Sequence, residues 1–229
     1  MPAHALDNPI WESLASRHRP LALGTGDVAR YPPEFAPFLG VAADGIDAAA
    51  ALEALVPPGD TVLLLGQAPV VSGGWHLERL AMLAQMVCPA PGAEVTGPDI
   101  VELSDAHRAD VLALTALVYP HYFRPRTMDL GRYFGIYEDG RLAAMIGERM
   151  GMDDWQEVSA VCTHPDCNGR GLARHLLVFL SNDNHARGRT PFLHVSPDNR
   201  RAIGLYERNG YRLRRGIPFW SLRRADMED

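Results

Sequence analysis

The sequence predicts an α/β protein with a mixed sheet, in which parallel and antiparallel strands occur together. Three observations lead to this fold class. Hairpin signals alternate with helical crossovers after residue 98, a segment rich in Pro and Gly interrupts the periodic patterns before it, and helix and strand patterns occur on both sides of that segment. We therefore expect two domains, a smaller N-terminal α/β lobe over residues 1–95 and a larger domain over residues 98–229.

Composition limits the possible classes of protein. The 229 residues can form one large or two small cores, and 47% hydrophobic with 22% charged residues is ordinary for a soluble globular protein. A net charge of −6, with arginines spread among acids, argues against nucleic acid as a partner. The three cysteines, Cys88, Cys162 and Cys167, form no CxxC pair, so neither a disulfide framework nor a metal site is expected.

The N-terminus carries His4, Asp7 and Glu12 where a signal peptide would need an apolar run. No stretch approaches the length of a membrane span. We expect a soluble cytoplasmic protein without a membrane partner, present as a monomer or a homodimer.

The first half of the chain alternates helix and strand patterns but has no catalytic signature. Asn8-Pro9 opens a short helical pattern, residues 46–56 form an Ala-rich helical segment, and the apolar run 61–66 predicts a buried strand. Residues 75–88 fit a strand and a helix equally well. The function of this half cannot be predicted from its residues.

The second half has clearer boundaries. Ser104 is placed to cap a helix, and Glu138 to Arg141 join two strands in a hairpin. The expected elements are a strand at 99–103, helices at 104–118 and 127–130, strands at 134–137, 142–150 and 155–163, a helix at 171–187, a strand at 192–195, a helix at 199–209 and a closing pair of strands on either side of Gly216.

The most informative segment passes from a strand through a glycine turn into an amphipathic helix. Gly169 and Gly171 would let main-chain N–H groups approach a ligand, and the first N–H groups of the following helix are unpaired. Together they favour an anionic group such as a diphosphate, although a tight turn alone also needs glycine. The Walker and dinucleotide patterns do not match, because Leu172, Ala173 and Arg174 follow.

Two blocks of the sequence resemble the GNAT superfamily of N-acetyltransferases. The segment 161–177 resembles its coenzyme-binding motif Gln/Arg-x-x-Gly-x-Gly/Ala, with Asn168 at the first position in place of Gln or Arg. The segment 191–211 resembles the strand–helix–strand unit that follows. The resemblance covers about residues 98–224 and is closest to the branch that includes glycine N-acyltransferase-like C-terminal domains, in which the N-terminal half is often a degenerate, partly GNAT-like lobe.

This resemblance implies a GNAT-like fold with splayed central strands and acetyl-CoA, or another acyl-CoA, as co-substrate. It implies that the N–H of Val161 binds the oxyanion. From their position after the glycine turn, Arg170, Arg174 and His175 are candidates to reach phosphate, and only Arg170 is favoured, because exposed cations in a first helical turn are commonly solvated. The implied coenzyme-binding residues are Val161, Cys162, Thr163, Asn168, Gly169, Arg170, Gly171, Leu172, Ala173, Asn199 and Tyr206.

Transfer of an acyl group to an amine needs a neutral amine, a donor to the oxyanion and a proton for the leaving thiolate. Tyr206 is the predicted general acid, because a tyrosine phenol with an ordinary pKa of about 10 keeps its proton at neutral pH. Simple packing of Tyr206 in the core is the alternative.

Glu157 is the predicted base. Strand alternation would place it on one face with Val161 and Thr163, and a semi-apolar cleft would raise its pKa. An ion pair with Arg149 is an equally open interpretation, and Glu148 and His194 are further candidates for the base. A role of Cys162 as nucleophile is disfavoured, because no base is paired with it.

The predicted function is therefore transfer of an acetyl or short acyl group from CoA to the amine of a small molecule or an amino acid. The segment 119–126, with its aromatic and arginine side chains, is a candidate acceptor loop for a carboxylate-bearing amine. Two alternatives stay open, a non-catalytic acyl-CoA-binding sensor or scaffold and a protein N-terminal acetyltransferase.

Overall fold

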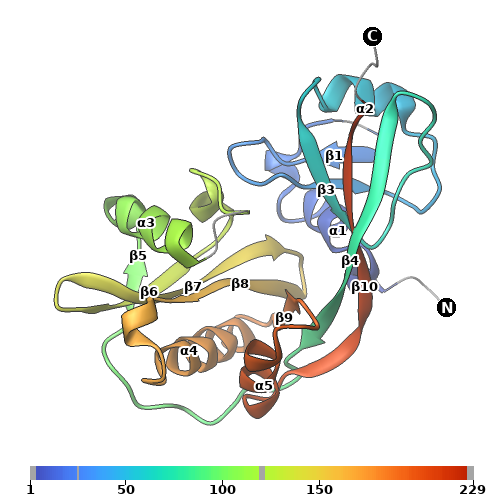
Figure 1. The fold of residues 1–229 in the computed structure, drawn as a ribbon. Coiled ribbons are helices and arrows are strands. Elements are labelled where there is room, and N and C mark those ends of the chain that lie inside the picture. Colours follow the sequence, from blue (N-terminus) through green and yellow to red (C-terminus); the bar gives the residue numbers. More distant parts are fainter. Residues whose placement is uncertain (1–3, 25, 119–121, 226–229) are drawn as a thin grey trace. The chain divides into compact units, whose positions relative to one another are not determined.

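The computed structural model describes residues 4–24, 26–118 and 122–225 (Figure 1). The chain forms two compact units, one of Met1–Leu83 with Gly216–Asp229 and the other of Ala84–Arg215. Their extents differ from those of the predicted domains, because the chain from Gly216 onward belongs to the first unit and the boundary near the middle of the chain falls after Leu83. Two strands, β4 (Trp75–Val87) and β10 (Arg212–Arg224), contribute residues to both units.

The first unit contains short elements around a small apolar core. In β10, residues 219–223 pair antiparallel with β3, and Leu39, Leu52 and Leu64 are buried beside them. The helices at Pro9 and in the Ala-rich segment and the strand from Thr61 agree with the predictions. The two three-residue strands β1 and β2 were not predicted. The elements are η1 (Ala5–Asp7), α1 (Pro9–Ala15), η2 (Arg19–Leu21), β1 (Val28–Arg30), β2 (Leu39–Val41), α2 (Ala49–Leu55) and β3 (Thr61–Leu65).

The second unit is built on a mixed sheet. Strands β5 to β8 form an antiparallel meander. Strand β9 joins β8 in parallel, and residues 84–87 of β4 pair antiparallel with β9. The mixed α/β class predicted from the sequence is therefore confirmed. The strands are β5 (Val101–Leu103), β6 (Tyr133–Glu138), β7 (Arg141–Gly151), β8 (Trp155–Thr163) and β9 (Thr190–Val195).

Helices cover both faces of this sheet (Figure 1). On one face α3 (Arg108–Val118), flanked by the short helices η3 (Asp105–His107) and η4 (Thr127–Leu130), buries Val111 and Leu114. On the other face α4 (Leu172–Ala186) buries Leu176 and Leu180, as its predicted apolar stripe requires. The helix α5 (Arg200–Arg208) follows β9, and η5 (Pro165–Cys167) precedes the glycine turn. In the described part of the chain, no helix is long and apolar enough to cross a membrane.

Strands β8 and β9 pair only near their starts. The parallel ladder joins Trp155 to Thr190 and ends where Glu157 lies opposite Phe192. Beyond that point β8 continues along β7, and β9 continues along β4. The two central strands therefore part at Glu157, which is the splay that the family resemblance implies.

A bulge interrupts β8 at Ala160, whose φ of +49° lies in the left-handed region. Ser159 is opposite Gly147 and Cys162 is opposite Met145, so three residue steps in β8 match two steps in β7. One extra residue is therefore inserted on the β8 side of this ladder.

The bulge inverts the alternation of side chains along β8. Val158 and Val161 both pack in the core under α4, although they are three positions apart and would lie on opposite faces of a regular strand. Ala160 and Cys162 pack in the core under α3. The expectation that Glu157 and Val161 share a face is wrong, because the extra residue at the bulge turns them toward opposite faces.

The two longest strands settle one open question and correct one prediction. Residues 75–87, which fitted helix and strand equally, form the 13-residue strand β4. The predicted pair of strands on either side of Gly216 is wrong, because β10 is one continuous 13-residue strand. Gly216 is part of this extended strand and does not turn the chain.

Candidate active site

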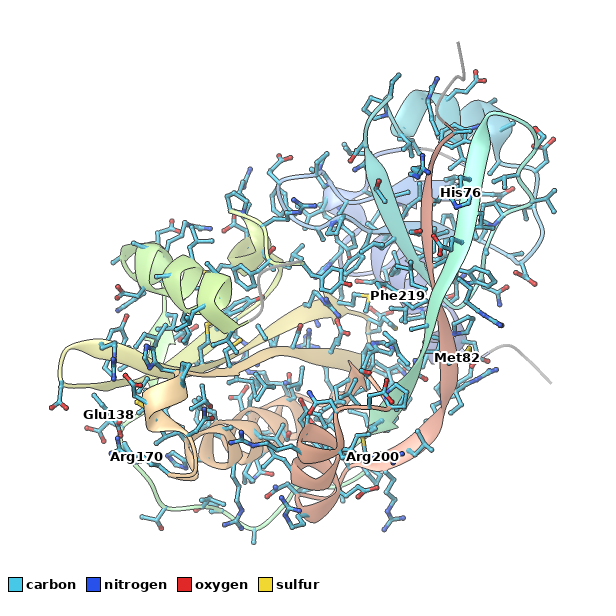
Figure 2. The ribbon with its side chains drawn as sticks, viewed as in Figure 1. His76, Met82, Glu138, Arg170, Arg200 and Phe219 are labelled. Atoms are coloured by element: carbon cyan, nitrogen blue, oxygen red, sulfur yellow. The ribbon has the colours of Figure 1, made fainter. Side chains whose placement is uncertain are left out.

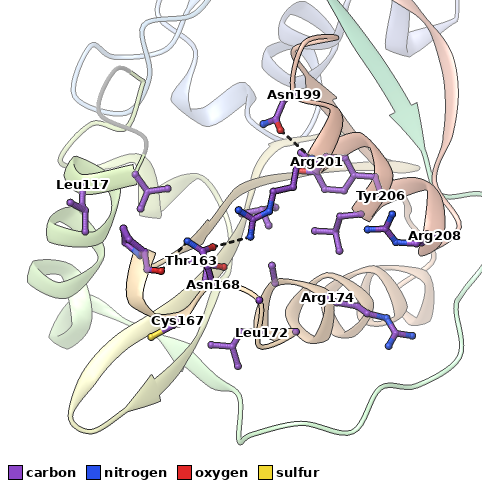
Figure 3. Close-up of a pocket in the computed structure, with 18 residues that line it drawn as sticks. Leu117, Thr163, Cys167, Asn168, Leu172, Arg174, Asn199, Arg201, Tyr206 and Arg208 are labelled. Atoms are coloured by element: carbon purple, nitrogen blue, oxygen red, sulfur yellow. Dashed lines mark hydrogen bonds between the residues drawn. The ribbon is translucent and has the colours of Figure 1, made fainter.

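A cavity of about 610 Å³ opens in the second unit beside the parted strands (Figure 3). Its walls come from the end of α3, the end of β8, the glycine turn, the first turn of α4 and one face of α5. The lining residues are Leu117, Val118, Val161, Thr163, Pro165, Cys167, Asn168, Gly169, Gly171, Leu172, Ala173, Arg174, Asn199, Arg201, Ala202, Leu205, Tyr206 and Arg208.

The glycine turn leaves open space where a ligand can approach the main chain. Gly169 and Gly171 have φ values of +79° and +80°, which glycine adopts without steric cost. A Cβ added at either position would meet no atom within 4 Å. Gly171 is the N-cap of α4, and no side-chain cap accepts a hydrogen bond from the first N–H groups of that helix, which by geometry have no intrahelical acceptors. The turn is therefore suited to bind an anionic group.

The charge of the cavity agrees with an anionic ligand. Arg174, Arg201 and Arg208 line it, and the described lining residues include neither Asp nor Glu. The chain as a whole carries a net charge of −6, so this concentration of cations is local. Arg201 donates a hydrogen bond to Oδ1 of Asn168 at 3.1 Å, which ties α5 to the glycine turn (Figure 3). Such a positive cavity attracts phosphate groups.

Helix α5 brings two predicted residues to the cavity. Asn199 caps the helix by accepting a hydrogen bond from the N–H of Ala202 at 3.1 Å. Tyr206 is 8% exposed and packs 5.8 Å from the ring of Tyr211, measured between ring centroids. Both Asn199 and Tyr206 line the cavity, so the two sequence blocks meet there.

Arg170 and Cys162 do not line the cavity. The guanidinium of Arg170 pairs with the carboxylate of Glu138, and Figure 2 shows the two side chains next to each other. Arg174, one helical turn further along, lines the cavity instead. Cys162 packs under α3, and burial raises the pKa of its thiol to about 12. Cys162 therefore serves as a packing residue at neutral pH.

Glu157 is completely buried at the point where β8 and β9 part, and it is not among the lining residues. Its carboxylate accepts two hydrogen bonds from Arg149, both at 2.7 Å, and one from Nδ1 of His194 at 2.8 Å. Burial alone would raise the pKa of Glu157, but the guanidinium of Arg149 and the N–H of His194 lower it to about 2. The expected raised pKa is wrong, and the alternative ion pair with Arg149 is present.

The structure also shows where Glu148 and the described part of the candidate acceptor loop lie relative to the cavity. Glu148 pairs with Arg132, away from the cavity. In the candidate acceptor loop, Tyr119, Pro120 and His121 lie outside the described residues. Arg126 forms an ion pair with Asp129 at 2.8 Å. The role of this loop in acceptor choice stays a prediction.

Sequence reasoning missed several lining residues. Arg201, Leu205 and Arg208 are separated by four and three positions and therefore share a face of α5. Steps of three or four positions counted from Tyr206 reach Ala202 but none of these three residues, so helical periodicity from the predicted acid would not have found them. Leu117 and Val118 on α3 are 55% and 38% exposed, and no local pattern distinguishes them from other surface residues.

A mixed sheet whose central strands part beside a glycine turn and a cationic cavity defines the class of the protein, an α/β protein of the GNAT fold. The model of the family described as FR47-like protein matches residues 133–220. The sequence matches no curated protein.

Solved structures extend the likeness to nearly the whole chain. A protein of Novosphingobium aromaticivorans assigned to the GNAT family of acetyltransferases is 34% identical, with a TM-score of 0.87, and the match covers 97% of this chain and 100% of the other. The chain therefore belongs to the GNAT family of acetyltransferases.

More distant structures share the fold. A GCN5-related N-acetyltransferase of Kribbella flavida is 16% identical, with a TM-score of 0.61, over 94% of this chain and 93% of the other. A GCN5-related N-acetyltransferase-like protein of Streptococcus suis is 14% identical, with a TM-score of 0.58, over 95% of each chain.

Proposed function

We propose that this protein transfers an acetyl or short acyl group from acyl-CoA to the amine of a small molecule or an amino acid. The observation that carries the proposal is the positive cavity over the turn from Gly169 to Gly171, next to the opening between β8 and β9. Membership of an acetyltransferase family supports the acyl donor. The finer placement beside glycine N-acyltransferase-like domains is part of this proposal and rests on the two sequence blocks.

The binding roles follow from the chemistry of the lining. The N–H groups of the glycine turn and of the first turn of α4 bind the diphosphate of CoA, and Arg174 and Arg201 neutralise its charge. Val161 and Thr163 face the cavity from β8 and hold the pantetheine arm, with the Val161 N–H as donor to the oxyanion.

The reaction forms one bond and breaks one. The neutral amine attacks the thioester carbonyl, the C–N bond forms, and the C–S bond breaks as the tetrahedral intermediate collapses. Tyr206 donates its phenolic proton to the leaving thiolate, which leaves as the free thiol of CoA. The proton of the amine restores the phenol through the base, so the enzyme ends the cycle unchanged.

Glu157 remains our prediction for the base, and its surroundings restrict how it can take up a proton. Because its side chain does not line the cavity, the amine proton reaches it through water. Its pKa of about 2 keeps it ionised, so it acts as a relay that passes the proton on and does not store it.

The test combines binding and turnover. Calorimetry with acetyl-CoA is expected to show uptake by the folded protein, and intact-mass detection is expected to show acylated products from a mixed library of amines and amino acids with several acyl-CoA donors. Tyr206→Phe should lower kcat by about 100-fold, since a positioned general acid contributes on this order. Tyr137→Phe is the matched control, because that hydroxyl donates to Asp110 at 2.7 Å, away from the cavity.

Each alternative predicts a distinct outcome. Absence of acetyl-CoA uptake overturns the proposal altogether. Uptake without transfer to any amine indicates a sensor or scaffold. Transfer confined to peptide N-termini indicates a protein N-terminal acetyltransferase.

A further inference from the structure

A series of hydrogen-bonded side chains crosses the sheet of the second unit and ends at Glu157. Arg214 on β10 donates to Oε1 of Gln85 at 2.7 Å. Nε2 of Gln85 on β4 lies 3.0 Å from Nε2 of His194 on β9. Nδ1 of His194 lies 2.8 Å from Oε1 of Glu157 on β8. Gln85 and Glu157 are 0% exposed, and the His194 side chain is 2% exposed.

The direction of each hydrogen bond can be derived from the arginine end. A guanidinium only donates, so the atom of Gln85 next to Arg214 must be the amide oxygen. The amide nitrogen of Gln85 therefore faces His194, and since an amide nitrogen only donates, Nε2 of His194 must accept. Nε2 of His194 then carries no proton.

The contact with Glu157 determines the protonation of the other ring nitrogen. An ionised carboxylate only accepts, so Nδ1 of His194 must donate to Glu157. Arg149 keeps Glu157 ionised through two hydrogen bonds of 2.7 Å. Taken together, the contacts with Gln85 and Glu157 require one tautomer of His194, the neutral ring with its proton on Nδ1.

The tautomer of His194 bears on the proposed reaction because His194 contacts Glu157, the predicted base. Glu157 occupies the last step of the β8–β9 ladder, where the opening between the strands begins. Its Oε1 accepts from both His194 and Arg149, so two donors on different strands fix the carboxylate.

We propose that Arg214, Gln85 and His194 are positioning residues that hold the Glu157 carboxylate at the opening between β8 and β9 through a single tautomer of His194. The proposal rests on the proposed function for its catalytic meaning. The tautomer itself does not depend on that function and can be measured without any ligand.

The first experiment is ¹⁵N NMR of the imidazole rings in the protein at neutral pH. The His194 signals, assigned by their loss in His194→Asn, are expected to have the pattern of a neutral ring protonated on Nδ1. Gln85→Glu replaces the donor opposite Nε2 with an acceptor, so it should convert His194 to the imidazolium pattern. Arg212→Leu, an exposed arginine on the same strand as Arg214, is the control and should change nothing. A ring protonated on Nε2 in the unmodified protein overturns the proposal.

The second experiment measures turnover with two replacements of His194. The Nδ2 of Asn lies as far along the side chain as Nδ1 of His, so His194→Asn keeps a donor to Glu157. In His194→Gln the amide nitrogen falls near Nε2 and the donor is lost. We expect His194→Asn to stay within about threefold of the unmodified kcat and His194→Gln to lose about tenfold or more, with KM for acyl-CoA unchanged in both.

The possible results distinguish a failure of the positioning role from a failure of the proposed acyl transfer. If both His194 variants melt normally but lose turnover equally, the positioning role is wrong while acyl transfer stands. If the unmodified protein neither binds acyl-CoA nor turns over, the proposed function fails, and the NMR pattern still decides the tautomer.

Discussion

Gly171 combines a backbone requirement with a position on the cavity. Its φ of +80° strains any residue with a Cβ, and nothing lies within 4 Å of the place a Cβ would occupy. Gly171→Ala should therefore lower the free energy of unfolding by about 1 kcal/mol through the backbone. It should also weaken acetyl-CoA binding at least tenfold, because the methyl group enters the space of the diphosphate. Urea unfolding and calorimetry measure the two effects.

Gly188 provides the matched control. It has a φ of +74°, has open space around its Cβ position and lies outside the cavity lining. Gly188→Ala should cost a similar free energy of unfolding and leave acetyl-CoA binding unchanged. Equal loss of binding in both variants would show that the turn at Gly171 affects the ligand only through stability.

The Glu157 carboxylate should make stability depend on pH in the acid range. Its pKa in the folded protein is about 2, below the ordinary value of 4.5, so its contribution is complete above pH 4.5 and is lost as the pH falls toward 2. The stability difference between the unmodified protein and Glu157→Gln, measured by urea unfolding, should therefore shrink over this window. A difference that stays constant from pH 6 to about pH 3 would contradict the assignment.

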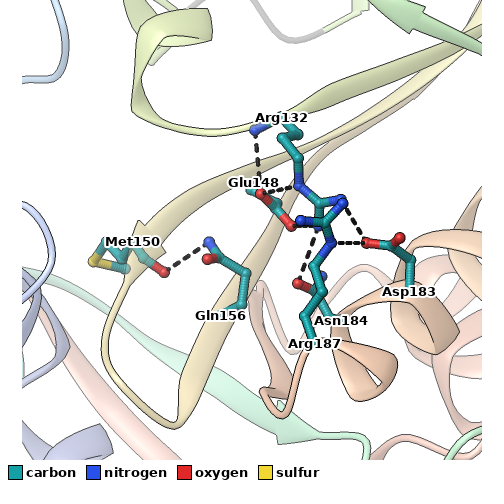
Figure 4. Close-up of polar contacts among 7 residues, drawn as sticks. All are labelled: Arg132, Glu148, Met150, Gln156, Asp183, Asn184 and Arg187. Carbon is teal, nitrogen blue, oxygen red and sulfur yellow. Dashed lines mark hydrogen bonds and ion pairs between the residues drawn. The ribbon is translucent and has the colours of Figure 1, made fainter.

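At the scale of elements, a polar cluster fixes α4 to the meander (Figure 4). Arg132, just before β6, pairs with Glu148 on β7 and with Asp183 on α4. Glu148 is 3% exposed, so its charge is stabilised almost entirely by these contacts. The cluster holds the far end of the helix whose first turn forms the cavity.

Breaking this cluster should destabilise the protein without altering the ligand site. Glu148→Ala leaves the guanidinium of Arg132 with half its hydrogen bonds and should cost about 3 kcal/mol of unfolding free energy, as measured by urea titration. Arg187→Ala, which removes only the exposed ion pair to Asp183 at 2.9 Å, should cost less than about 1 kcal/mol. Similar costs for the two variants would contradict a special role for the buried carboxylate.

The elements also show what periodicity can and cannot predict. The amphipathic helix α4 and the meander were predicted because their residues repeat every 3.6 or every 2 positions. The bulge at Ala160 was not, because alanine carries no signal for a left-handed φ, and one inserted residue reverses every later side chain. Arg170 was favoured for phosphate because it lies in the glycine turn, but its pairing with Glu138 depends on a strand 32 positions away.

At the scale of the whole molecule, the strands that belong to both units determine which fragments can fold. A fragment of residues 98–229 lacks residues 84–87, which pair with residues 192–195 of β9. A fragment of residues 84–215 keeps that pairing. We expect the second fragment to unfold cooperatively and the first to aggregate, as measured by circular dichroism during thermal unfolding. Cooperative unfolding of both fragments would show that the β4 segment is dispensable.

The irregularity at Ala160 also determines how relatives of this chain have to be compared. Even-numbered positions of β8 pack under α4 before the bulge, as Val158 does, and under α3 after it, as Cys162 does. An alignment that assumes one uninterrupted strand therefore assigns the residues on one side of the bulge to the wrong face of the sheet. Counterparts of Glu157 must be counted from the start of the strand, and counterparts of Val161 from the glycine turn backward. A relative lacking the extra residue would present a different set of side chains to the same ligand, even if every other residue of the strand were identical.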